Sequence, residues 1–317
     1  TIMSTQTSDN NKRIAKNTLF LYLRMFVMMV VSLFTSRVVL AVLGAQDYGI
    51  YNIIGGVIVL FSFLNSALSA ATQRFLNFNL GKKDYAQASG VFCMSMNVYL
   101  ILSLIIMVLA ETVGLWFVNT QLNIPVSRMN AANWVYQFTI VTFIISLIRI
   151  PYNASILAYE RMDFYAYTSL GEVVLKLLVV YVLYVSSFDK LIVYAFLYTI
   201  VPLLITIIYK VFCTKNFEIC RYKRGWNKEI FKNLFGFTGW SLFGSVATMS
   251  AQQGLNILIN IFCGVTVNAA VGVANQVCAA VNQFVGNFQT AFRPQIIKDF
   301  AAGEYDKFYN FNTPLNF

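Results

Sequence analysis

Four basic side chains lie inside long apolar stretches of the sequence. Arg37 is close enough to the end of its stretch to reach an interface, which leaves Arg24, Arg149 and Lys176 as the candidates for anion binding. Ionisable groups in membrane-spanning segments usually face a bundle interior or a watery cavity, because lipid solvates them poorly. An arginine also offers a planar fork of N–H donors that matches phosphate oxygens. An alternative for Arg24 is a packing role, paired with a residue of a neighbouring helix. An alternative for Lys176 is neutralisation by Glu172, four residues earlier.

Amide side chains form a second candidate set. The segment 275–289 alone holds six Asn or Gln residues. Small polar residues can line packing seams between membrane helices, but this many buried amides are costly to satisfy without water. We therefore expect the amide-bearing helices to line a hydrated cavity. Its candidate substrate ligands, besides the three cations, are Asn65, Gln73, Gln252, Asn256, Asn275, Asn282 and Gln289.

The composition excludes a soluble domain. Of 317 residues, 58% are hydrophobic and 11% are charged, and the mean hydropathy is +0.64; soluble domains carry about a quarter charged residues. Histidine is absent, and the five cysteines lack paired metal-ligand spacing. We expect no zinc, haem or other cofactor and no catalytic residue.

The chain is predicted to be an all-α polytopic membrane protein with about eight transmembrane helices. The loops that would lie on one side hold 17 of the 23 Lys and Arg residues, whereas the loops on the other side hold only Arg128 and Lys190. Because a basic excess marks cytoplasmic loops, both termini are predicted to be cytoplasmic. The predicted helices cover 17–43, 49–71, 91–118, 133–157, 165–185, 191–212, 234–262 and 267–292.

The domain organisation follows from a basic connector and an internal repeat. Residues 213–233 are the longest polar interruption, and their charge suits anionic lipid headgroups better than nucleic acid. After residue 233 the sequence pattern of the first two helices recurs, with an offset of about 220 residues. Such internal repeats are typical of transporters built from repeated lobes. We predict a tail at 1–16, a six-helix lobe at 17–212, the connector at 213–233, and the first two helices of an incomplete second lobe at 234–317.

Four motifs carry a resemblance to a known family. They are KRIAKNTLFLYLRMF near the start, RVVLAVLGAQDYGIYN around the first turn, ERMDFYAY at 160–167 and FRPQI at 292–296. The chain resembles the bacterial polysaccharide flippases for O-antigen and capsule lipid-linked oligosaccharides, within the multidrug/oligosaccharidyl-lipid/polysaccharide exporter superfamily. Members have twelve to fourteen helices in two six-helix lobes, with the first, second, seventh and eighth lining the cavity. The resemblance therefore implies a chain truncated at its C-terminal side.

The resemblance also implies a function. It indicates a flippase, not an enzyme, that moves a polyprenyl-pyrophosphate-linked oligosaccharide across the inner membrane for surface polysaccharide biosynthesis, as in lipopolysaccharide O-antigen. Transport would proceed by alternating access, with the cations attracting the diphosphate and the amides bonding the sugars. The expected partners are the lipid-linked oligosaccharide, the bilayer and the glycan assembly machinery, and not nucleic acid.

Two alternatives stay open. A cation-coupled multidrug exporter of the same superfamily would need carboxylates in the cavity, whereas only Glu111 and Glu172 lie inside predicted helices. A membrane glycan polymerase or ligase would place its chemistry on a large outer loop. The longest outer loop here, 119–132, contains no histidine and one basic residue, Arg128.

Overall fold

The computed structural model describes the backbone of residues 2–59, 62–122 and 124–303, and the side chains of most of these except 2–17, 32–33, 56–64, 66 and much of 249–283. All regular elements in these ranges are helical, which confirms the predicted all-α class. They are α1 Ile2–Val59, α2 Ser62–Gly81, α3 Tyr85–Leu109, a π-helical turn Ala110–Gly114, α4 Leu115–Thr120, α5 Met129–Ala158, α6 Met162–Val185, α7 Lys190–Asn216 and α8 Lys228–Ala301, with short 3-10 turns at Val126–Arg128 and Glu218–Cys220.

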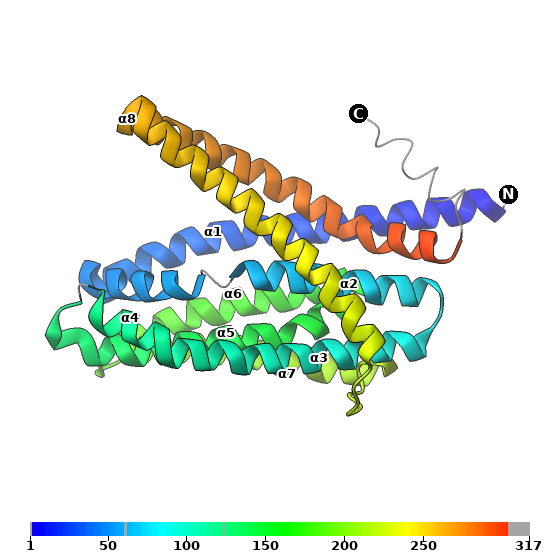
Figure 1. Ribbon diagram of the computed structural model, residues 1–317, viewed down its shortest axis with the longest axis horizontal. Coiled ribbons are helices and arrows are strands. Elements are labelled where there is room, and N and C mark those ends of the chain that lie inside the picture. The colour runs from blue at the N-terminus through cyan, green and yellow to red at the C-terminus, as the bar shows by residue number, and fades with distance from the viewer. Residues whose placement is uncertain (1, 60–61, 123, 304–317) are drawn as a thin grey trace.

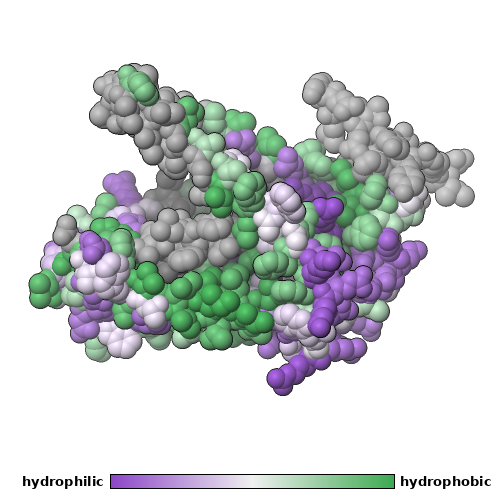
Figure 2. Space-filling view, viewed as in Figure 1, coloured by the Kyte–Doolittle hydropathy of each residue, from purple (hydrophilic) through white to green (hydrophobic). Residues whose placement is uncertain are grey.

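Five segments of the described chain are long and apolar enough to cross a membrane. They are Thr18–Gly55, Tyr85–Thr120, Val126–Ala158, Met162–Val185 and Lys190–Asn216. The first, Thr18–Gly55, includes the turn predicted between the first two helices at 43–49. The other four match the predicted third to sixth helices. The remaining predicted crossings fall at the break between α1 and α2 and on α8. Figure 2 shows hydrophobic residues across the middle of the bundle and hydrophilic residues at both ends, with the larger group at the right-hand end.

The helix α1 reverses direction at Gly44. This residue has φ 79° and ψ 164° inside an otherwise helical run. Only glycine adopts such angles without a steric penalty. In Figure 1 the blue helix accordingly runs from the N-terminus to the far end of the bundle and returns towards α2. The predicted turn at 43–49 thus separates two antiparallel limbs.

The helix α8 also doubles back. A straight helix of its 74 residues would be about 110 Å long. Yet Leu234, near its start, lines a pocket with Leu68 of α2, and near its end the Lys298 carbonyl oxygen lies 2.6 Å from where a Cβ on Gly81 of α2 would be. Figure 1 shows the two limbs, yellow and orange, side by side, with their shared tip pointing away from the other helices. The predicted seventh and eighth helices correspond to these limbs.

The helix α5 forms the centre of the body made by α1 to α7. Tyr136 is fully buried on it, and its hydroxyl donates a hydrogen bond of 2.8 Å to the carbonyl oxygen of Ala110. That carbonyl begins the π-helical turn, where the backbone hydrogen bonds are irregular. A Cβ on Gly114 would lie 2.0 Å from the same hydroxyl. Glycine is therefore required there, and the contact fixes α3 and α4 against α5.

Candidate functional site

Two of the three predicted cations share one carboxylate. Arg149 Nη1 lies 3.1 Å from Glu172 Oε2, and Lys176 Nζ lies 2.8 Å from Glu172 Oε1. The predicted neutralisation of Lys176 by Glu172 is confirmed. The approach of Arg149 from α5 was not predicted, because it depends on how α5 packs against α6. Two cations against one anion leave one net positive charge at this triad.

Arg24 of α1 lies on the same side of the body. Its guanidinium carbon is 4.4 Å from the centroid of the Tyr165 ring, and its Nε is buried without a hydrogen-bond partner in the described part of the chain. The Arg149 guanidinium carbon lies 6.0 Å from the centroid of the Tyr209 ring. Tyr165 and Tyr209 belong to one apolar cluster, so the two arginines lie over rings of the same cluster. The structure does not pair Arg24 with Glu172.

Next to the triad is a polar cavity of about 270 Å³ between α1, α6 and α7. Lys176, Asn52, Thr35 and four tyrosines line it, together with Ser36 and apolar residues of α1 and α6. Hydroxyl, amide and ammonium groups are hydrogen-bond donors, so this cavity suits an anion or a hydroxyl-rich group. The tyrosines are Tyr48, Tyr51, Tyr194 and Tyr198. Sequence reasoning missed them, because in an apolar stretch a tyrosine resembles ordinary core.

A second cavity of about 270 Å³ shares Tyr51 and Tyr198 with the first. It contains the predicted ligand Asn65, whose Nδ2 donates to Ser146 Oγ at 3.5 Å. The structure therefore places two predicted ligands, Lys176 and Asn65, in adjoining cavities. Both cavities lie inside the six-helix body, whereas the sequence places the predicted cavity between two lobes.

The other predicted amides are not gathered there. Gln73 is buried on α2 and its Nε2 has no partner in the described part of the chain, but it lines neither cavity. Asn282 and Gln289 are exposed on α8. The side chains of Gln252, Asn256 and Asn275 lie outside the described residues. The sequence analysis also missed Asn77, which is one turn beyond Gln73 and fully buried, with both side-chain polar atoms unpartnered among the described residues.

At the end of the bundle near Gly44, an ion-pair cluster joins three elements. Arg128 Nε donates to Asp47 Oδ1 at 2.9 Å, and Arg128 Nη1 donates to Asp189 Oδ2 at 2.6 Å. Burial alone would raise the pKa of Asp189, but hydrogen bonds from Arg128 and from the backbone N–H groups of Leu191 and Ile192 lower it below its usual value. We call Asp47, Arg128 and Asp189 the clamp.

At the opposite end, which carries Lys82 and the 213–233 connector, an ion pair joins α8 to the body. Lys298 Nζ lies 2.8 Å from Glu160 Oε1, and the Glu160 side chain is only 6% exposed. Glu160 belongs to the short loop between α5 and α6 and has φ 57°. We call this pair the latch, and we call this end of the molecule the basic end.

Comparisons with known proteins give matches in structure only. No protein-family model and no curated protein sequence matches the chain. An outward-facing multidrug resistance MATE family transporter of the MOP superfamily has a TM-score of 0.74 at 15% identity, over 95% of this chain and 67% of that chain. A MATE structure in complex with MaD3S has a TM-score of 0.79 at 13% identity, over 95% and 68%.

A third structure differs in its pocket. It is a MOP superfamily transporter from Pyrococcus furiosus Vc1, described as having a binding pocket of reverse polarity that suggests a different function. Its TM-score is 0.71 at 15% identity, over 95% of this chain and 67% of that chain. Identities this low establish the fold and not the substrate. By its fold, then, this chain is similar to the MATE transporters of the MOP superfamily, and it spans about two thirds of their length.

Proposed function

We propose that the protein is a flippase, not an enzyme, that moves a polyprenyl-pyrophosphate-linked oligosaccharide across the bacterial inner membrane by alternating access. The observation that carries this proposal is the sign of the charge in the body. Arg149 and Lys176 share a single carboxylate, Glu172, whose two oxygens are both engaged, and Arg24, over the Tyr165 ring, adds a third positive charge. A surplus of cations attracts a diphosphate and disfavours a cationic drug.

The cavities support the glycan part of the proposal. Tyrosine hydroxyls, threonines and amides line them, and such groups both donate to and accept hydrogen bonds from sugar hydroxyls. The basic end would face the cytoplasm, where the positive-inside rule places basic loops. The protein would then receive its cargo from glycan assembly enzymes on that side.

A multidrug exporter is the second candidate, and the multidrug resistance transporter among the structural neighbours favours it. Cation coupling would then require a carboxylate that is free to exchange protons or metal ions. Glu172 is held by two cations, and Glu111 accepts a hydrogen bond of 3.0 Å from Gln137. The charge of the described interior therefore supports the flippase over the exporter.

The test is translocation of a radiolabelled lipid-linked oligosaccharide in vesicles that contain the protein. We expect Arg24→Ala to abolish translocation without lowering the abundance of the protein. The buried Nε of Arg24 has no hydrogen-bond partner in the described part of the chain, so the substitution leaves no partner of that atom unpaired. Arg24→Lys should recover part of the activity, since the charge remains while the planar fork is lost. Normal translocation by a stably inserted Arg24→Ala protein would remove Arg24 from the site. Export of cationic dyes without glycolipid translocation would favour the second candidate.

A further inference from the structure

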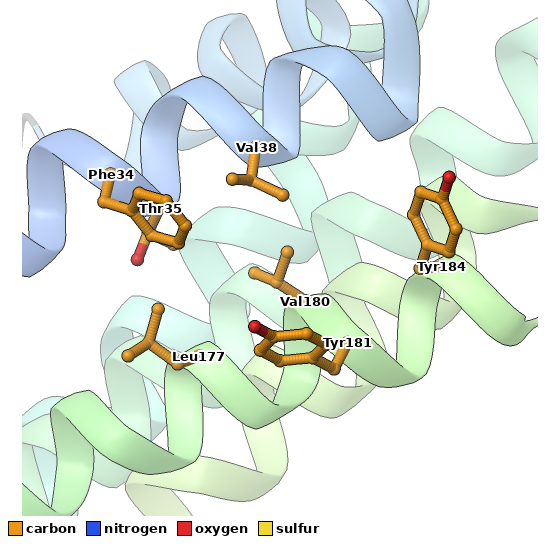
Figure 3. A pocket seen from close by; sticks show the side chains of 7 residues that line it. All are labelled: Phe34, Thr35, Val38, Leu177, Val180, Tyr181 and Tyr184. Carbon is orange, nitrogen blue, oxygen red and sulfur yellow. The ribbon is translucent and has the colours of Figure 1, made fainter.

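A groove of about 260 Å³ runs between α1 and α6 on the surface of the body. Figure 3 shows side chains of α1 above it and side chains of α6 below it, with Thr35 pointing towards Leu177. The lining is almost entirely apolar. It consists of Phe34, Thr35, Val38, Leu177, Val180, Tyr181 and Tyr184.

The groove lies between two candidate membrane spans, so in a membrane it would face the hydrocarbon region. It is open to the surface, because its lining residues Phe34 and Tyr181 are 56% and 69% exposed. Its floor is closed, because Val180 is only 5% exposed and packs in the cluster that holds α1 against α6 and α7. An open apolar channel with a firm floor fits a flexible hydrocarbon chain by van der Waals contact.

The groove adjoins the polar cavity, because Thr35 lines both of them. The triad supplies one net positive charge behind that cavity. A ligand that fills both spaces must therefore have an apolar chain and a polar, anionic head.

We propose that this continuous site binds a polyprenyl phosphate lipid, with its chain in the α1–α6 groove and its phosphate in the cavity beside Lys176. This proposal rests on the proposed function and assigns the lipid part of the cargo to a definite place. The chain would stay in the bilayer while the head is held within the body.

The experiment uses two neighbouring leucines of α6. Leu177 lines the groove, whereas Leu178 is not among its lining residues and is 53% exposed. The full chain is placed in phosphatidylcholine nanodiscs, and the binding of radiolabelled polyprenyl phosphate is measured. Leu177→Trp fills the groove and should weaken binding about tenfold. Leu178→Trp adds the same bulk on the lipid-facing side and should leave binding unchanged.

The head is tested separately. Lys176→Gln should weaken binding of polyprenyl phosphate about tenfold, and the uncharged polyprenol should bind weakly to every variant. A benzophenone side chain introduced at Tyr181 should cross-link the polyprenyl phosphate. Equal competition by phosphatidylglycerol, or equal effects of Leu177→Trp and Leu178→Trp, would overturn the proposal. Melting temperatures of all variants exclude loss of fold as the cause.

These measurements involve no transport. If vesicles translocate the glycolipid while Leu177→Trp binds polyprenyl phosphate normally, the flippase proposal stands and the groove is not the lipid site. If the lipid binds in the groove but no glycolipid is translocated, the site stands and the flippase proposal fails.

Discussion

The clamp and the latch are both formed by ion pairs at the ends of the bundle, yet they join different elements. The clamp binds the turn of α1, the start of α5 and the start of α7, so all its members belong to the six-helix body. The latch joins the α5–α6 loop of that body to the second limb of α8. One cluster makes the body rigid, and the other fixes a separate hairpin to it.

The two ends of the α8 hairpin also differ in how they contact the body. Near the basic end Ala291 is buried in a cluster with Leu21 and Leu157, and Asn287 Nδ2 lies 3.0 Å from Met25 Sδ. Towards the tip the described residues Leu255 and Phe262 are 56% and 80% exposed. The hairpin is held at one end and stands clear at the other. Under the proposed function, this difference between the two ends is what alternating access requires of two lobes.

The largest expected effect comes from removing the centre of the clamp. Arg128→Ala strands the carboxylates of Asp47 and Asp189, and hydrogen bonds to charged groups contribute about 1.5–3 kcal/mol each before solvent screening. We expect a clear fall in melting temperature for the full chain in detergent. Lys190→Ala, an exposed cation at the same end, is the control and should melt like the parent. An unchanged melting temperature for Arg128→Ala would show that the clamp does not hold the body together.

Breaking the latch should change motion more than stability. Lys298 is 23% exposed, and Lys298→Gln keeps an N–H donor for the buried Glu160 carboxylate, so this variant should lower the melting temperature less than Arg128→Ala does. We expect it to release α8 from α2. A cysteine placed at buried Asn77 should then react faster with a water-soluble maleimide, measured against a parent background that lacks exposed Cys278.

A neighbouring ion pair provides the control for the latch. Arg161 Nε and Asp163 Oδ1 lie 3.1 Å apart in the same loop region, at 45% and 40% side-chain exposure, and Arg161 also lies over the Phe212 ring of α7. Arg161→Gln should therefore leave labelling at position 77 unchanged. The swap Glu160→Lys with Lys298→Glu should restore slow labelling. Fast labelling in the swap would mean that the pair does not close this end.

The smallest expected effect is on the pH dependence of the clamp. The folded state lowers the pKa of Asp189, so the unfolded chain binds more protons in the acid range. The stabilisation is therefore complete above the unfolded pKa of about 3.9 and is lost as pH falls through the lower folded pKa. Asp189→Asn should melt below the parent at neutral pH, and this difference should shrink as the pH falls towards 3. A constant difference would assign the effect to packing.

The sequence predicted the parts of this fold that depend on local pattern. The ends of α5, α6 and α7 follow from apolar stretches bounded by polar loops, and the reversal at Gly44 follows from a glycine-bearing turn. The pair Glu172–Lys176 follows from i, i+4 spacing. The contacts that could not be predicted from the sequence depend on packing between helices. No local signal shows that Arg149 reaches Glu172, or that four tyrosines of α1 and α7 surround a cavity.

The amide residues also show what the sequence could not predict, because it grouped residues that the structure keeps apart. Their number predicted one shared cavity, but Asn65 lies in the six-helix body while Asn282 and Gln289 stand exposed on α8. Helical spacing tells which residues share a face and does not tell what that face meets. Asn77 shows this most clearly, because its burial against neighbouring elements leaves both amide atoms unpartnered among the described residues.

The order of residues in the clamp has a consequence for the synthesis of the protein. Asp47 precedes Arg128 by 81 residues, and Asp189 follows Arg128 by 61. At about 5–20 residues per second, translation reaches Arg128 roughly 4–16 s after Asp47 has been made. During that interval Asp47 on the first hairpin has no ion-pair partner from the clamp. No ion pair of the clamp can therefore hold the hairpin in its final position. Ribosome-bound chains that end before Arg128 should therefore hold this hairpin less firmly than chains that extend beyond Asp189.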